Sequence, residues 1–228
     1  MKHQVLYSKA GIATQILVTD NQFFLLLDVG DGIIRDLLNI GLKFPINKPI
    51  YIFITHGHFD HCGGLFSFLG FLRMLNHNLP VTICSPKQCE EVESLFKSFQ
   101  TAYSSTIPFS IDHRTLEAQE NISITEDIEI RSYQMQHSGS IVGKGKLSDI
   151  PALGYAIFSD SEKLIAFTGD TGITEDVENL VRGAGHAYIE STNLPGKSNS
   201  YHLTPGEARQ LGNLAKSYTL IHTRYESR

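Results

Sequence analysis

The sequence predicts an α/β fold, an αββα sandwich in which two mixed β-sheets face each other and helices flank them. Three observations lead to this prediction. Both halves of the 228-residue chain contain short apolar runs, many of them β-branched, followed by segments of helical periodicity. No linker rich in Gly, Pro or Ser separates the halves, so one domain is expected over residues 1–228. Two facing sheets with outer helices would bury the apolar side of every such element.

In the first half, short strands precede helices. Strands are expected at Val5–Tyr7, Thr14–Val18, Phe23–Asp28, Ile50–Ile54 and Val81–Cys84. Helices are expected over Ile33–Ile40, Gly63–Asn76 and Pro86–Phe99. Ser85, Pro86 and Gln88 have the spacing of an N-cap, a proline at the first helical position and a capping-box partner. The third helix is therefore expected to begin at Pro86.

The second half repeats the order of strands followed by helices. Strands are expected at Ile122–Ile124, Ile128–Met135, Leu153–Phe158, Leu164–Thr168, Ala187–Glu190 and Tyr218–Ile221. One helix is expected near Glu175–Val181. Thr204 and Glu207 form a second capping-box pattern, which predicts a helix that runs to about Lys216.

Composition excludes several classes of protein. The chain is 41% hydrophobic and 19% charged, which is typical of a globular protein. A formal net charge of −5 excludes a broadly basic surface for nucleic acid, although it leaves room for a local basic patch. Cys62, Cys84 and Cys89 are too few for a disulfide scaffold, so reduced thiols and a cytoplasmic location are expected. We expect no membrane association, because no export signal and no bilayer-length apolar run is found.

The strongest chemical signal is the segment His56-Gly-His58-Phe-Asp60-His61, which directly follows the predicted strand Ile50–Ile54. His56 and His58 can share a face, because alternate residues of an extended segment point the same way. Asp60 and His61 are adjacent and point in different directions. One short loop can therefore supply ligands to two neighbouring metal ions.

This loop resembles the H-x-H-x-D-H signature of the metallo-β-lactamase superfamily, and further motifs follow in the family's order. The resemblance implies the αββα fold described above and implies three more ligands, each at the end of a predicted strand: His137, Asp170 and His222. It implies that one metal is bound by His56, His58, His137 and Asp170, and a second by Asp60, His61, His222 and the shared Asp170. Imidazole and carboxylate ligands suit two Zn²⁺ ions, with Mn²⁺ or Fe as alternatives.

One aspartate outside this set also has a counterpart in the family. Asp28 resembles the position that braces the metal loop. An ordinary turn aspartate in Asp28-Val-Gly-Asp-Gly is the other interpretation of the same residue.

Two further segments indicate a branch of the superfamily. Glu190-Ser-Thr192 and Tyr201-His202-Leu-Thr204 resemble the Glu–Thr–His arrangement of ribonuclease Z and related phosphodiesterases. This resemblance implies a metal-bridging hydroxide as nucleophile, His202 as the general acid for the leaving alkoxide, and Glu190 as the residue that sets the charge of His202. Asp60 is expected to be both a metal ligand and a catalytic residue. The alternative interpretation of His202 is that it merely precedes a well-capped helix.

The chain also departs from ribonuclease Z, which carries a long basic arm for tRNA between its third and fourth motifs. Only 32 residues, positions 138 to 169, separate His137 from Asp170. The basic cluster Gly143-Lys-Gly-Lys146 is small and is interpreted as a solvated hairpin tip. The negative net charge provides no general attraction for a phosphate backbone. A small phosphodiester or another small molecule is therefore a better candidate substrate than tRNA.

A second hydrolytic function stays open on the same scaffold. A lactone, thioester or β-lactam hydrolase would use the same two metals. Such leaving groups need less help from a separate acid, so Glu190 and His202 argue against this alternative.

The apolar segment Leu65–Leu75 suggests a homodimer. Leu65, Phe68, Leu69 and Leu72 form one stripe of this helix, whereas Phe66, Phe71 and Met74 lie mostly off it. A helix that is apolar nearly all round is either deeply buried or part of an interface. We expect structural roles for Cys62 and for the remaining histidines, which are His3, His77, His113 and His186.

Overall fold

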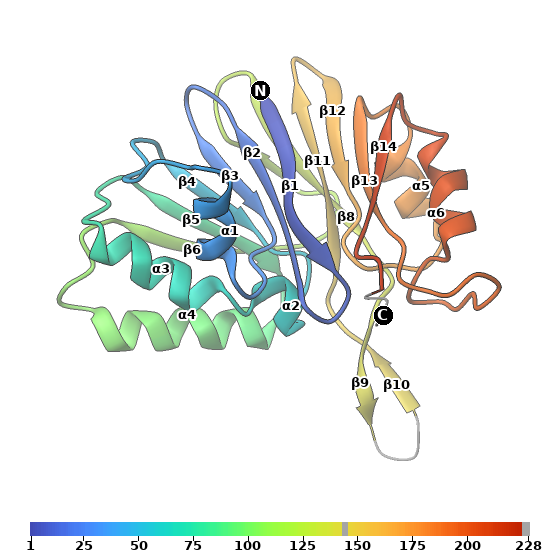
Figure 1. Ribbon diagram of the computed structural model, residues 1–228, viewed down its shortest axis with the longest axis horizontal. Helices are drawn as coiled ribbons and strands as arrows, with labels where there is room; N and C mark the ends of the chain where they lie inside the picture. Colours follow the sequence, from blue (N-terminus) through green and yellow to red (C-terminus); the bar gives the residue numbers. More distant parts are fainter. Residues whose placement is uncertain (143–145, 225–228) are drawn as a thin grey trace. The chain divides into compact units, whose positions relative to one another are not determined.

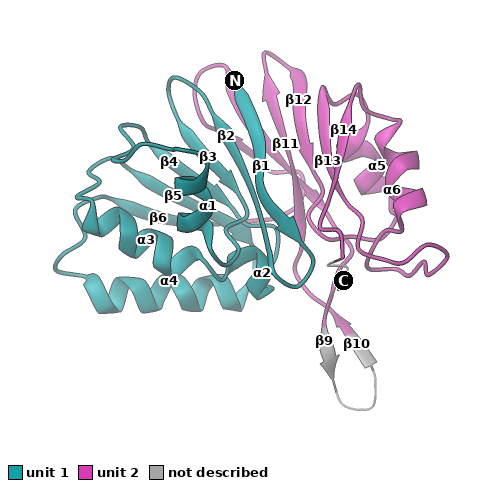
Figure 2. Ribbon diagram, in the orientation of Figure 1, with its two compact units in different colours: residues 1–115 teal, residues 116–228 magenta. Residues whose placement is uncertain are grey.

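The structure, a computed structural model, describes residues 1–142 and 146–224, and the side chains of these residues except 140–142 and 146–147. The chain divides into two compact units, residues 1–115 and residues 116–228 (Figure 2). Each unit contains a six-stranded mixed sheet and helices of its own. The single domain over residues 1–228 stays a prediction. None of the helices in the described ranges is long and apolar enough to cross a membrane.

Unit 1 is built on a sheet in the order β1-β2-β3-β4-β5-β6 (Figure 1). The strands are β1 (Lys2–Lys9), β2 (Ala13–Thr19), β3 (Phe24–Leu27), β4 (Ile50–Phe53), β5 (Val81–Pro86) and β6 (Ile111–Leu116). β1, β2 and β3 pair antiparallel, whereas β3, β4 and β5 are parallel. The carboxyl ends of the three parallel strands therefore meet at one edge of the sheet, where the predicted metal loop begins.

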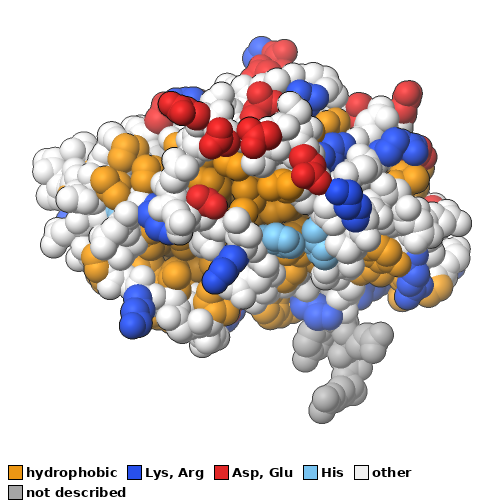
Figure 3. All heavy atoms as spheres, turned by 90° about the horizontal axis from the view of Figure 1, so that it is seen from above, with side chains coloured by type: hydrophobic (Ala, Val, Ile, Leu, Met, Phe, Trp, Pro, Cys, Tyr) orange, Lys and Arg blue, Asp and Glu red, His pale blue; other side chains and the backbone are white. Residues whose placement is uncertain are grey.

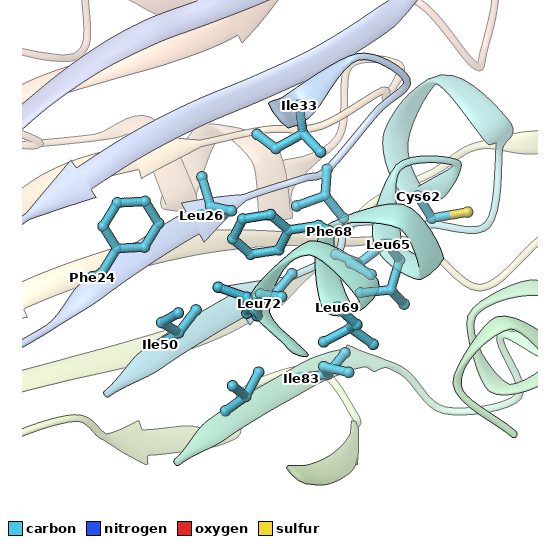
Figure 4. Close-up of a cluster of buried hydrophobic side chains, with 14 of the residues drawn as sticks. Phe24, Leu26, Ile33, Ile50, Cys62, Leu65, Phe68, Leu69, Leu72 and Ile83 are labelled. Atoms are coloured by element: carbon cyan, nitrogen blue, oxygen red, sulfur yellow. The ribbon is translucent and has the colours of Figure 1, made fainter. Parts of the chain in front are cut away.

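Helices cover one face of this sheet (Figure 1). They are α1 (Ile33–Asn39), α2 (Phe59–Cys62), α3 (Leu65–Met74) and α4 (Glu90–Tyr103). Strand residues such as Leu26 and Ile83 pack with Phe68, Leu69 and Leu72 of α3 in one fully buried cluster (Figure 4). The parallel strands are apolar along most of their length because a covered parallel sheet leaves little of them in water.

The loop after β3 and the turn between α2 and α3 approach each other very closely. The Gly64 amide donates a hydrogen bond of 2.8 Å to the Val29 carbonyl. A β-carbon on Gly64 would lie 2.3 Å from the Gly30 carbonyl oxygen, and one on Gly30 would lie 2.4 Å from the Asp60 carbonyl oxygen. Only glycine fits at these two positions, and the close contact fixes the metal loop against the sheet edge.

The predicted helix over Gly63–Asn76 corresponds mainly to α3, preceded by the short α2. Its second apolar face is covered within unit 1, because Phe66 packs edge-on to Phe99 at a ring distance of 5.7 Å and Phe71 packs on Phe44 at 4.9 Å. Of the apolar residues named for this helix, only Met74 is exposed. Burial inside unit 1 accounts for the apolar pattern of this helix. The pattern therefore no longer supports a homodimer, which stays a prediction.

The predicted helix start at Pro86 is wrong. β5 continues to Pro86, and the Ser85 hydroxyl forms a hydrogen bond of 2.8 Å with Nε2 of His113 on β6 instead of capping a helix. α4 begins at Glu90, and its first turn is acidic, which is favourable at the positive end of the helix dipole. β6 was not predicted, because this edge strand carries charged residues and lacks a continuous apolar run.

Unit 2 contains a sheet in the order β14-β13-β12-β11-β8-β7 and a separate two-stranded hairpin of β9 and β10. The strands are β7 (Asn121–Ser123), β8 (Ile128–Gln134), β9 (Ser138–Val142), β10 (Lys146–Asp149), β11 (Leu153–Ser159), β12 (Glu162–Phe167), β13 (His186–Glu190) and β14 (Tyr218–Ile221). β12, β13 and β14 are parallel, and β8 runs in the same direction because it is antiparallel to β11, which is antiparallel to β12. The predicted basic tip at residues 143–145 lies outside the described residues.

The helices of unit 2 are α5 (Glu175–Val181) and α6 (Pro205–Gly212). The predicted capping box is confirmed, since Thr204 Oγ1 accepts from the Glu207 amide and Glu207 Oε2 accepts from the Thr204 amide at 2.7 Å. α6 ends at Gly212, earlier than predicted. A β-carbon on Gly212 would lie 2.5 Å from the ring of Tyr218, so this glycine makes room for β14 to pass the helix end.

Candidate metal centre

The four predicted ligands of unit 1 come together in the loop between β4 and the start of α3. His56, Asp60 and His61 are buried, and His58 is half-buried. The Nε2 atom of His56 lies 3.1 Å from Nδ1 of His58, and the rings of His56 and His61 are 4.1 Å apart. This is the dense cluster of imidazole and carboxylate groups that the loop sequence predicts.

A buried pair of residues fixes the orientation of two of these imidazoles. Asp28, directly after β3, accepts hydrogen bonds from the Thr55 amide at 2.7 Å, from the Thr55 hydroxyl at 2.9 Å and from His61 Nδ1 at 2.7 Å. Because the Thr55 hydroxyl donates to Asp28, its oxygen is the acceptor for His56 Nδ1 at 3.0 Å. Both histidines therefore carry a proton on Nδ1 and direct Nε2 into the cluster, His56 Nε2 toward His58 Nδ1 at 3.1 Å and His61 Nε2 toward Asp60 Oδ2 at 4.0 Å.

Asp28 is thus a brace of the metal loop rather than an ordinary turn residue. Burial raises the pKa of Asp28, while the charge of His61 and the hydrogen bonds from His61 and Thr55 oppose that rise. Sequence reasoning missed Thr55. Its only signal is its place between an apolar strand and the first histidine of the loop.

A second brace comes from the turn between β1 and β2. The amide of Gly11 donates a hydrogen bond of 2.7 Å to Oδ2 of Asp60. Gly11 has a φ of +70°, a conformation that favours glycine. The contact fixes the orientation of the Asp60 carboxylate. No local sequence pattern predicts this contact, because 49 positions separate the two residues.

The predicted ligands of unit 2 lie at one edge of its sheet. His137 follows β8, Asp170 follows β12 and His222 follows β14, and these three strands run in the same direction. All three residues are buried. Asp170 Oδ2 lies 3.8 Å from His137 Nε2, and Asp170 Oδ1 lies 3.0 Å from His222 Nδ1. Asp170 therefore lies between the two histidines, as a shared carboxylate would.

Both histidines of this edge are also held at Nδ1. His137 Nδ1 faces the Tyr201 carbonyl at 3.2 Å and can only donate to it. The Thr192 hydroxyl donates to the His222 carbonyl at 2.9 Å, so its oxygen is the acceptor for His222 Nδ1 at 2.8 Å. His137 therefore carries its proton on Nδ1 and directs Nε2 toward Asp170 Oδ2 at 3.8 Å, whereas His222 Nδ1 lies between the Thr192 hydroxyl at 2.8 Å and Asp170 Oδ1 at 3.0 Å.

These groups fit a divalent transition metal. Metal-binding histidines usually donate their second N–H to a carboxylate, a carbonyl or another acceptor, which fixes the tautomer and the ring. His56, His61, His137 and His222 all have such an acceptor at Nδ1. With carboxylates in the same clusters, the donor set suits zinc and related ions.

The pair of Glu190 and His202 lies next to Asp170. His202 Nδ1 is 3.0 Å from Glu190 Oε1 and 3.9 Å from Asp170 Oδ2. Glu190 is fully buried at the end of β13, and its oxygens also accept from the amides of Thr192 at 2.8 Å and Leu203 at 3.0 Å. This carboxylate is therefore rigid, and it holds Nδ1–H of the half-buried His202. The predicted contact between the two residues is confirmed.

The geometry of unit 2 also permits a ligand role for His202. Asp170, His202 and His222 each offer one possible ligand atom, and these three atoms lie within 4.8 Å of one another. The contact of His202 Nδ1 with Glu190 leaves Nε2 as the atom that would act in either role.

Two of the remaining histidines contact serine hydroxyls. His186 contacts the Ser217 hydroxyl with Nδ1 at 2.8 Å, and His113 contacts Ser85. The three cysteines are free and buried. Burial raises the pKa of Cys62 and raises those of Cys84 and Cys89 to about 12, so none is a thiolate at neutral pH.

The fold and these clusters define a member of the beta-lactamase superfamily, and comparison with known proteins agrees. The family model described as "Beta-lactamase superfamily domain" matches residues 40–223, so the chain belongs to this family.

Relatives of known sequence include ribonuclease Z. The chain is 27% identical to ribonuclease Z of Porphyromonas gingivalis over 130 residues, which cover 57% of this chain and 38% of that protein. It is 26% identical to ribonuclease Z of Parabacteroides distasonis over 154 residues, which cover 67% of this chain and 45% of that protein. The matched region thus spans less than half the length of these two relatives.

Solved structures confirm the fold. Human tRNase Z, short form, superposes with a TM-score of 0.75 at 19% identity, over 98% of this chain and 93% of that one. A diphosphatase from the PhnP family superposes with a TM-score of 0.69 at 18% identity, over 97% of this chain and 86% of that one. The predicted metallo-β-lactamase fold is therefore confirmed.

Proposed function

We propose that this protein is a two-metal phosphodiesterase. The observation that carries the proposal is the rigid pair of Glu190 and His202 beside Asp170. The leaving oxygen of an ordinary phosphodiester is a poor leaving group, so its departure needs a proton. A lactone or β-lactam would need such an acid less.

In this proposal seven residues bind two metal ions. His56, His58, His137 and Asp170 bind one ion; Asp60, His61, His222 and the shared Asp170 bind the other. Membership of the superfamily and the braced Nε2 atoms support this assignment. Zinc is the proposed metal, with Mn²⁺ or Fe as alternatives. Two such ions, when bound, lower the pKa of coordinated water and withdraw charge from phosphate oxygens.

The side chains then have separate tasks. Glu190 holds Nδ1–H of His202 and thereby directs Nε2 to the substrate, where Nε2–H gives its proton to the leaving oxygen. Asp60, whose carboxylate is oriented by the Gly11 amide, is a metal ligand in this proposal. Glu207 caps α6 and takes no part in the reaction.

The proposed substrate is a small phosphodiester rather than tRNA. The names of the relatives, ribonuclease Z and a diphosphatase, support hydrolysis at phosphorus. On the face seen in Figure 3, Lys and Arg side chains are scattered and form no continuous basic surface, and Asp and Glu side chains gather in the upper half of the view. Together with the net charge of −5, this favours a substrate that is bound locally. A cytoplasmic location and a homodimer are further proposals; a monomer mass in light scattering would exclude the dimer.

Turnover of a panel of substrates tests the proposal. The zinc-loaded protein is expected to hydrolyse bis(p-nitrophenyl) phosphate, and the panel adds a cyclic nucleotide, pre-tRNA and a lactone. Turnover of the lactone without any phosphodiester would contradict the proposal and favour the alternative hydrolase. Cleavage of pre-tRNA at a comparable rate would contradict the preference for small substrates.

A variant tests the general acid separately. His202→Ala should lower turnover of diesters with poor leaving groups much more than turnover of activated aryl diesters, and its metal content should match the wild type. Equal losses for both kinds of ester would remove the acid role. Loss of one metal ion would instead make His202 a ligand.

A further inference from the structure

Two asparagine side chains hold the main chain of His202, which lies in the segment between β13 and α6. Asn199 Oδ1 accepts hydrogen bonds from the His202 amide at 2.9 Å and from the Tyr201 amide at 2.8 Å. Asn193 Nδ2 donates to the His202 carbonyl at 2.7 Å. Both polar groups of the His202 main chain are therefore bound by side chains from the preceding loop.

The two asparagines also bind each other. Asn199 Nδ2 donates to Asn193 Oδ1 at 3.3 Å. A main-chain amide needs an acceptor and a carbonyl needs a donor, so the contacts with His202 fix which way each side-chain amide points. That orientation places Asn193 Oδ1 and Asn199 Nδ2 toward each other. The two side chains and the main chain of His202 thus form a closed ring of hydrogen bonds.

One member of the pair is anchored in the buried part of unit 2. Asn193 is 7% exposed and follows the end of β13 by three residues. Its main-chain amide donates to the Leu203 carbonyl at 2.9 Å, and the Leu203 amide donates to Glu190 Oε1 at 3.0 Å. The chain after His202 is therefore tied to the same carboxylate that holds His202 Nδ1.

The chain before His202 lies against the turn that carries Asp170. A β-carbon on Gly172 would lie 2.1 Å from the Ser200 carbonyl oxygen, so the two segments touch closely. In this arrangement His202 Nδ1 lies 3.0 Å from Glu190 Oε1 and 3.9 Å from Asp170 Oδ2. A rotation of the main chain at His202 would change both distances.

We propose that Asn193 and Asn199, here called the asparagine clamp, are positioning residues for His202. The inference rests on the proposed function, in which His202 is the general acid. Residues 194–198 between the two asparagines are exposed, and the clamp separates His202 from movements of this loop. A proton donor must lie within hydrogen-bond reach of the leaving oxygen, and a displacement of about 1 Å can cost about a hundredfold in rate. The clamp acts through His202 and takes no part in bond cleavage.

Amide hydrogen exchange, measured by NMR on the zinc-loaded protein, tests the clamp without turnover. In Asn199→Ala the His202 amide loses its acceptor and should exchange about tenfold faster than in the wild type. Asn199→Asp keeps an acceptor oxygen and should keep most of the protection. Ser198→Ala, which removes a 2.6 Å hydrogen bond to Glu207 from the same loop, should not change exchange at His202. Unchanged exchange in Asn199→Ala would overturn the clamp.

Turnover separates positioning from a general effect on stability. Asn193→Ala and Asn199→Ala should slow diesters with poor leaving groups about 10–100-fold and an activated aryl diester much less, with wild-type zinc content. Ser198→Ala should not change the dependence on the leaving group. Equal losses for both kinds of ester would overturn the positioning role. Loss of a zinc ion would overturn it as well, because the clamp would then support a metal ligand.

Failure of the proposed function gives a different result from failure of the clamp. A wild type that cleaves no phosphodiester would refute the phosphodiesterase proposal and with it the catalytic role of the clamp, even where exchange at His202 still depends on Asn199. A wild type that cleaves phosphodiesters with a leaving-group dependence that neither asparagine changes would refute the clamp alone.

Discussion

The brace beneath the metal loop leads to a quantitative prediction for Thr55→Val. Valine has nearly the shape of threonine, so the substitution removes the hydroxyl and keeps the packing. The Thr55 hydroxyl lies 2.9 and 3.1 Å from the two oxygens of Asp28 and 3.0 Å from His56 Nδ1. The variant therefore loses one hydrogen bond to a buried carboxylate and the acceptor that fixes the tautomer of His56.

The size of each effect follows from these contacts. A hydrogen bond to a charged group contributes about 1.5–3 kcal/mol to stability, and we expect a loss of that size in the metal-free protein. The Thr55 amide and His61 still donate to Asp28, so the carboxylate is not left bare. Loss of a hydrogen bond that orients a metal ligand lowers metal affinity about 10–100-fold, and we expect zinc affinity to fall in this range.

Two measurements check this prediction. Urea unfolding of the metal-free protein gives the free energy of unfolding, and competition with a chromophoric chelator gives zinc affinity. Thr55→Ser is the matched control, because it keeps the hydroxyl and should stay close to the wild type in zinc affinity. A Thr55→Val protein with wild-type stability and wild-type zinc affinity would refute the bracing role.

Three further predictions concern other contacts. Lys163→Met should lower stability by about 2 kcal/mol in urea unfolding, because the half-buried Lys163 ammonium donates to three main-chain carbonyls at the end of α5, at 2.7, 2.9 and 3.0 Å. Burial lowers the pKa of His77 from its ordinary value of 6.5, so the free energy of unfolding should fall as the pH decreases below that value. His77→Gln should remove up to about 1.4 kcal/mol per pH unit of this fall, as measured by unfolding between pH 7 and 5. Gly30→Ala should reduce zinc affinity strongly, because its β-carbon would lie 2.4 Å from the main chain of Asp60, whereas Gly57→Ala meets only a movable side chain and should bind zinc nearly as the wild type does.

Each of these predictions has an outcome that contradicts it. For Lys163 the control is Lys216→Met, which removes an exposed ion pair with Glu162 and should cost little; equal losses would argue against the helix-end contacts. An unchanged pH dependence in His77→Gln would show that this histidine is protonated equally in the folded and unfolded states. Equal zinc affinities for Gly30→Ala and Gly57→Ala would contradict the close approach at Gly30.

Of the proposed ligands, those from His56 to His61 could be predicted from a local pattern, whereas His137, Asp170 and His222 were assigned from the resemblance to the superfamily. The metal loop directly follows a strand, and His137, Asp170 and His222 each follow a strand that ends at one edge of its sheet. Hydrophobic periodicity predicts the strands that these residues follow, and the resemblance predicts which residues after them are ligands.

The residues that hold the ligands could not be predicted in the same way. Thr55 and Thr192 act through the direction of one hydroxyl, and Gly11 acts through a main-chain amide far away in sequence. Ser85 shows the opposite error: its spacing fits a helix cap, yet pairing with β6 extends the strand and turns the hydroxyl to His113. In that case strand pairing overrode the local capping pattern.

The metal content of the purified protein tests the central claim most directly. That claim is that the seven proposed ligands bind two divalent ions and that Asp170 is common to both. After loading with zinc and removal of unbound metal, mass spectrometry should find about two ions per chain. The Asp170→Ala variant should retain fewer, because it lacks the carboxylate common to both ions. Less than about half an ion per wild-type chain would contradict the two-metal centre.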